Sequence, residues 1–156
     1  MLAPYAGKCD TNWNDFNIVT HAGFAVLKAK PHSAVGVLAN GRVALTAFVP
    51  TDRAFQILVK NLTGKTYTTE AAVYAAVLKL GVPTVEKVLL YHVVPGATIP
   101  AASALKANGA HLKTALGLTF TVVVSSCPRI TLVDRDPYIV NPRVILSLTN
   151  INIGNK

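Results

Sequence analysis

The chain has 156 residues, a length that suits one domain with a single core of ordinary size. Its composition is apolar, with 51% hydrophobic residues, 14% charged residues and a mean hydropathy of +0.42. Lys, Arg, Pro or Gly nevertheless interrupts every apolar stretch before about 18 residues, so no transmembrane helix is expected. The net charge of +8 favours weak adhesion to anionic surfaces. The basic residues are scattered along the sequence and do not form the clusters expected of a nucleic-acid-binding protein.

The N-terminal part of the chain predicts an arm followed by two helices. Residues 1–14 contain Pro, Gly and Asn without hydrophobic periodicity, which is typical of an arm. A first helix is predicted from a cap at Asp15 to a point before Pro31, because the residue before proline resists helical geometry. Its expected buried side chains are apolar: Phe16, Val19, Ala22, Phe24 and Leu27. A second, short helix is predicted over residues 33–38.

The segment of residues 46–55 reads Thr-Ala-Phe-Val-Pro-Thr-Asp-Arg-Ala-Phe and is the most informative in the chain. Residues 42–49 mix β-branched, aromatic and small apolar side chains, which predicts a strand. Pro50 ends this strand because it has no N–H to donate. Thr51 or Asp52 is then expected to cap a helix. Its apolar face is expected to comprise Ala54, Phe55, Leu58, Val59 and Leu62.

Two more helices and a series of short strands are predicted next. Thr69 is expected to cap a helix over residues 70–80, and Thr84 a helix over residues 85–91. Beyond Gly96, apolar runs rich in β-branched residues alternate with turn residues, which predicts strands. These runs lie around Leu112 and over residues 118–124, 130–133, 138–140, 144–148 and 151–153. A helical first half with one early strand, followed by a stranded second half, predicts an α+β fold.

Residues 46–55 and residues 91–96, Tyr-His-Val-Val-Pro-Gly, resemble the T-x-F-x-P-T-x-x-A-F and Y-H-x-x-P-G motifs of the fasciclin domain. Further similarity to secreted bacterial members lies in residues 68–70, 96–99 and 132–136. The resemblance covers about residues 15–156 and implies one fasciclin-like wedge, a β-sandwich of short strands with helices packed alongside. Members of this family usually close with a strand carrying an I-H-x-I-D-x-V-L-like segment, so we expect the final family strand to be missing here.

The chain offers few groups for catalysis or metal binding. It has no nucleophile elbow, no H-E-x-x-H, no phosphate loop and no dinucleotide fingerprint, and its four histidines share no zinc-ligand spacing. Asp15, Asp52 and Glu70 lie at predicted helix starts, where capping explains them. Asp134 and Asp136 could bind a divalent cation, but the arginine between them favours a solvated turn. We therefore expect no enzymatic activity, no metal and no cofactor.

The resemblance implies a secreted or cell-surface adhesion module whose partner is a cell-surface or matrix protein or an acidic polysaccharide. In matrix proteins with fasciclin domains the Tyr-His region is linked to integrin-mediated adhesion, which makes Tyr91 and His92 candidate partner-binding residues. The alternative is that both residues hold the turn before Pro95. Reduced attachment without loss of melting temperature in a double alanine variant would indicate a recognition surface. Secretion would also favour a disulfide between Cys9 and Cys127.

A second hypothesis belongs to a different functional class, the carriage of an apolar small molecule. Some algal fasciclin-like proteins are similar in fold and bind carotenoids in water. The high apolar content and low charge of this chain could line a groove between helices and sheet, as such a ligand requires. The candidate lining residues are the apolar side chains near the two motifs: Ile57, Val94, Ile99, Leu105 and Leu116.

Overall fold

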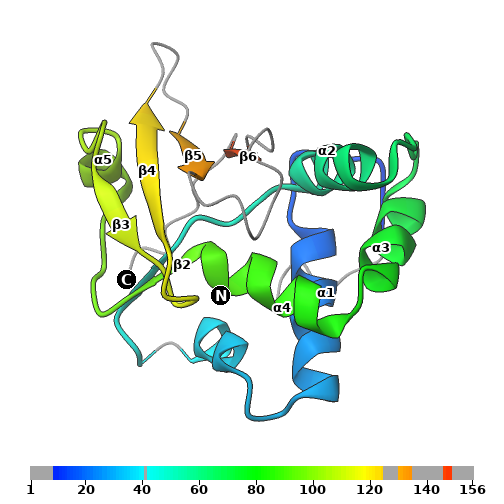
Figure 1. Cartoon of the computed structure of the whole chain (residues 1–156), viewed down its shortest axis with the longest axis horizontal. Helices are drawn as coiled ribbons and strands as arrows, with labels where there is room; N and C mark the ends of the chain where they lie inside the picture. Colours follow the sequence, from blue (N-terminus) through cyan, green and yellow to red (C-terminus); the bar gives the residue numbers. More distant parts are fainter. Residues whose placement is uncertain (1–8, 41, 125–129, 135–145, 149–156) are drawn as a thin grey trace.

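The computed structural model describes residues 9–40, 42–124, 130–134 and 146–148. Most of the helices gather on one side of the molecule, at the right in Figure 1, and the larger sheet lies on the other. The combination of helices with two small antiparallel sheets confirms the predicted α+β class. No helix within these ranges combines the length and the apolar character needed to cross a membrane.

The helical side is formed by segments from the first 91 residues. In chain order these are α1 (Asn17–Ala29), the 3-10 helix η2 (Ala34–Ala39), α2 (Asp52–Thr63), α3 (Glu70–Lys79) and α4 (Val82–Tyr91). The predicted cap at Thr69 forms: its side chain accepts a hydrogen bond from the N–H of Ala72 at 3.3 Å. The Ser33 side chain, placed inside the predicted short helix, instead caps η2 by accepting a hydrogen bond from the N–H of Val35 at 3.2 Å. The predicted Thr84 cap is wrong, because α4 already begins after Gly81.

The strands form two separate sheets. The smaller one pairs β1 (Leu45–Ala47) with β2 (Val93–Pro95), and the larger has the order β3-β4-β5-β6, antiparallel throughout. Its strands are β3 (His111–Lys113), β4 (Thr119–Val124), β5 (Ile130–Asp134) and β6 (Leu146–Leu148), and α5 (Ala101–Ala104) precedes them. The strands predicted over 138–140 and 151–153 lie outside the described residues. β2 was not predicted, because three residues are too few to show a periodicity.

Two cores support these elements. The larger one lies among the helices, where Phe55, Leu58 and Val59 of α2 are completely or almost completely buried. The smaller one lies between β1–β2 and the larger sheet, where the rings of Phe48 and Phe120 meet edge to face at 5.4 Å. Such an aromatic pair stabilises a core beyond the apolar area it removes from water.

Two predictions of burial are wrong. Phe24 is 51% exposed and Leu62 is 44% exposed. The buried face of α1 includes Ala22 and Val26, and Phe24 lies two residues from each, which places it on the opposite side of a helix with 3.6 residues per turn. Leu62 lies in the last turn of α2, one turn beyond the buried Leu58.

Candidate functional site

The two family-like motifs lie side by side through the pairing of β1 with β2. The N–H of Phe48 donates a hydrogen bond to the carbonyl of His92 at 2.9 Å. The buried Thr46 hydroxyl donates to the carbonyl of Ala97 and accepts from the N–H of Ile99, both at 2.8 Å. The first motif therefore fastens the segment that follows the second one.

Gly96 makes the turn at the end of the second motif possible. Its φ of 81° lies in the left-handed region, where a side chain would strain the backbone. Its N–H donates to the carbonyl of Ala44 at 2.9 Å, which closes the ribbon beyond the β1–β2 pairing. Glycine at this motif position thus has a structural explanation.

Tyr91 and His92 face the interior at the end of α4. Their exposed fractions are 4% and 3%, and the Tyr91 ring lies edge-on to Phe120 at 5.9 Å. A partner that binds the folded surface cannot reach either side chain in this conformation. Their position therefore does not support the predicted partner-binding role and favours the structural alternative.

His92 is held as a neutral imidazole. Its Nδ1 donates to the Val88 carbonyl at 2.7 Å, which fixes the proton on Nδ1 because a carbonyl only accepts. The other nitrogen, Nε2, is buried and has no hydrogen-bond partner in the part of the chain that the structure describes. Complete burial lowers the pKa of His92 to about 4, against the smaller opposing effect of the hydrogen bond to Val88.

A small apolar hollow lies beside His92. Its lining includes Val19, Phe48, Pro50 and Leu89 together with the imidazole. The hollow has room for about one water molecule, which is far less than a carotenoid requires. This hollow therefore does not serve as the groove that carriage of an apolar molecule would need.

The five residues proposed to line a groove fall into two groups. Val94 is buried in the smaller core, and Ile99, Leu105 and Leu116 pack against that core. Ile57, on α2, is 37% exposed and does not belong to it. Sequence reasoning thus identified four neighbours, which here pack among the rings of Phe48 and Phe120.

Three helices begin close to the described part of the arm. The carbonyls of Asp15 and Trp13 accept hydrogen bonds from the N–H groups of Asp52 and Arg53, each at 3.0 Å, and so cap α2. In return, Asp52 Oδ1 accepts from the N–H of Ile18 at 2.9 Å and caps α1. The predicted side-chain cap of α1 by Asp15 is wrong, because a residue from another helix takes that position.

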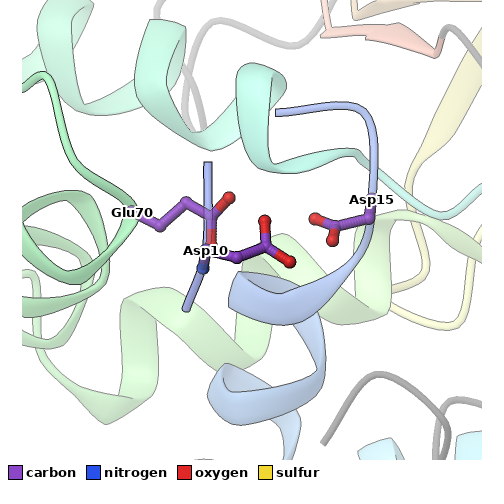
Figure 2. A group of neighbouring side chains, drawn as sticks. All are labelled: Asp10, Asp15 and Glu70. Carbon is purple, nitrogen blue, oxygen red and sulfur yellow. The ribbon is translucent and has the colours of Figure 1, made fainter. Parts of the chain in front are cut away.

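Four acidic residues meet at these helix starts. One carboxylate oxygen from each of Asp10, Asp15 and Glu70 lies within 4.8 Å of the other two, and the carboxylates face one another in Figure 2. Asp52 is completely buried beside them. Burial, and then a hydrogen bond shared with Asp15, raises the pKa of Asp52 to about 8, and burial likewise raises the pKa of Glu70.

Sequence patterns explain these acids one at a time, mostly as helix caps, and do not predict that their carboxylates cluster. Part of a signal is present in the chain, because Asp10, Asn12, Asn14 and Asp15 place side-chain oxygens at nearly alternate positions. Glu70 enters the group only through the packing of α3 against α1 and α2. A local pattern alone could not have included it.

The remaining predicted site residues are placed as follows. Cys9 is half-buried and has no disulfide partner among the described residues; the pKa of its thiol is raised by burial first and then by the Glu70 and Asp52 carboxylates. Cys127 lies outside the described residues, so the disulfide stays a prediction. Asp134 ends β5, and Asp136 also lies outside the described residues.

Residues 24–150 match the fasciclin domain family, a range that includes both motifs and every strand described above. The chain belongs to this family. Fasciclin domains are generally adhesion or interaction modules, are typically non-enzymatic, and are commonly extracellular or at the cell surface. A comparison with curated proteins and a comparison with solved structures gave no significant match.

Proposed function

We propose that this fasciclin domain is a non-enzymatic extracellular attachment module, whose basic exterior binds anionic partners such as an acidic polysaccharide or an acidic matrix or cell-surface protein. The family supplies the general role. The basic surface favours an anionic partner, since complementary charge raises both the rate and the selectivity of association.

The observation that supports this proposal is the separation of charges in the structure. Every Lys and Arg side chain that the structure describes is exposed. Asp15, Asp52 and Glu70 are instead partly or fully buried at the helix starts, and Glu86 pairs with Lys30. The described exterior is therefore more basic than a net charge of +8 alone suggests.

We expect the domain to be retained on immobilised heparin at low ionic strength and to elute as NaCl is raised. Exposed charges are screened by salt, so the apparent affinity should fall steeply between low and physiological ionic strength. Elution from a heparin column, compared with elution of an acidic protein of similar size, measures this. Passage through the column without retention would contradict the proposed anionic partner.

Paired variants show whether the attraction is spread over the surface. Lys60→Gln with Lys65→Gln alters the end of α2, and Lys106→Gln with Lys113→Gln alters the side with the larger sheet. Each pair removes two exposed charges and should lower the eluting salt concentration by a similar amount. Glu86→Gln frees Lys30 and should raise it.

Carriage of a carotenoid or other apolar molecule is the second candidate, favoured by the clustering of Val94 with Ile99, Leu105 and Leu116. Because these side chains pack among aromatic rings, we expect gel filtration of the domain after incubation with carotenoids to give a colourless protein peak. Stoichiometric co-elution of pigment would reverse the order of the two proposals.

A further inference from the structure

No basic side chain that the structure describes forms an ion pair with the carboxylates of Asp10, Asp15 or Glu70. The ion pair within the described ranges joins Lys30 to Glu86 instead. Like charges this close repel one another strongly where burial lowers the local dielectric. A group of three carboxylates in a protein of net charge +8 therefore calls for a specific explanation.

Helix capping explains only part of the group. In each of Asp15, Asp52 and Glu70, one carboxylate oxygen accepts a hydrogen bond from a neighbouring N–H or amide group. The second oxygen of each is buried and has no hydrogen-bond partner among the described residues: Asp15 Oδ1, Asp52 Oδ2 and Glu70 Oε1. Buried polar atoms are normally paired, so these three oxygens require an explanation: either two of them share a proton or a partner is missing.

Glu70 gives the decisive observation. A proton shared between Asp15 and Asp52 would pair the second oxygens of those two residues, but Glu70 Oε1 would still have no partner. The Glu70 side chain is only 1% exposed, and its carboxylate points toward those of Asp10 and Asp15 (Figure 2). An acceptor buried in this way and directed at two other carboxylates suits a cation.

We propose that Asp10, Asp15 and Glu70 bind a hard divalent cation, with Ca²⁺ as the ion of best fit. Their oxygens lie within 4.8 Å of one another, and two oxygens that share a Ca²⁺ at 2.3–2.6 Å can be at most about 5 Å apart. Mg²⁺ requires distances of about 2.1 Å and hence a tighter group. The ligands are all oxygen atoms, which excludes a preference for softer metals.

The surroundings permit entry of the ion and completion of its shell. Asp10 is exposed, whereas Glu70 is buried, so the group is open to solvent on one side. Ca²⁺ takes 6–8 oxygen ligands, and water would supply those that three carboxylates do not. An incompletely protein-bound ion of this kind is held with a dissociation constant of about 0.1–1 mM.

Two measurements on the full chain test the site. After treatment with EDTA, adding Ca²⁺ to about ten times the dissociation constant should raise the melting temperature by about 4 °C, and EDTA should reverse the rise. Tb³⁺, which replaces Ca²⁺ in oxygen sites, should show luminescence excited through Trp13. This residue is the single tryptophan and lies in the loop between Asp10 and Asp15, and Ca²⁺ should displace the signal.

Matched acid-to-amide variants decide where the ion binds. Asp10→Asn and Glu70→Gln should each weaken Ca²⁺ binding at least about tenfold, while Glu86→Gln, outside the group, should bind as the unchanged protein does. If Glu70→Gln does not fold, the exposed Asp10→Asn alone decides. Absence of both the thermal shift and the Tb³⁺ signal, or their persistence in Asp10→Asn, would overturn the proposal.

Discussion

Replacing Tyr91 with alanine is expected to lower the free energy of unfolding by about 3–5 kcal/mol, the usual effect of removing a buried aromatic side chain. The Tyr91 ring is 4% exposed and lies against the rings of Phe120 and His92, so its loss would leave a cavity in the smaller core. Because small domains are stable by only about 5–15 kcal/mol, the double variant with His92→Ala should be largely unfolded. Urea unfolding followed by circular dichroism measures the change.

Two controls separate packing from recognition in that experiment. Tyr91→Phe keeps the ring and should retain most of the stability that alanine removes. Phe24→Ala removes an aromatic side chain that is 51% exposed and should change the free energy of unfolding by less than about 1 kcal/mol. A Tyr91→Ala variant that keeps the stability of the unchanged protein and yet loses attachment would restore the predicted recognition surface.

Much of the fold could be predicted because its elements carry local signals. Thr69 caps α3 with the residue type and spacing that a helix start requires, and Ser33 does the same for η2. The run of β-branched and apolar residues over 118–124 likewise predicted β4. The errors at Phe24 and Asp15 have another origin. Residues distant in sequence determine which face of α1 is buried, and a residue distant in sequence, Asp52, caps its first turn.

The candidate site was less predictable for the same physical reason. The motif residues identified the family. Their pairing through β1 and β2, and their burial under the larger sheet, depend on contacts between segments distant in sequence and could not be predicted. The acidic group combines Asp10 of the arm with Glu70 of α3, which are 60 residues apart and joined by a hydrogen bond of 2.7 Å. No local spacing relates two such residues, so only the packed helices reveal them.

The second large effect is the loss of folding stability that His92 should cause when the pH is lowered. The pKa of His92 falls from 6.5 in the unfolded chain to about 4 in the folded one, so between these values the unfolded chain binds the extra proton. Stability from this residue is therefore complete above about pH 6.5, decreases progressively as pH falls toward 4, and is fully lost below that value. A difference of 2.5 pKa units corresponds to about 3 kcal/mol. Urea unfolding at a series of pH values from about 7 to 4 measures it.

His92→Asn isolates this effect from other titrating groups. Asparagine places an N–H donor where Nδ1 lies, so it can keep the hydrogen bond to the Val88 carbonyl, but it does not titrate. The Asp52 carboxyl, with its pKa raised to about 8, changes stability in the opposite direction in both proteins and cancels from the difference between them. That difference should shift by about 1.4 kcal/mol per pH unit between pH 6.5 and 4. Equal pH dependence in the two proteins would mean that the buried imidazole accepts a proton without resistance, and that its neutral state does not hold the turn between α4 and β2.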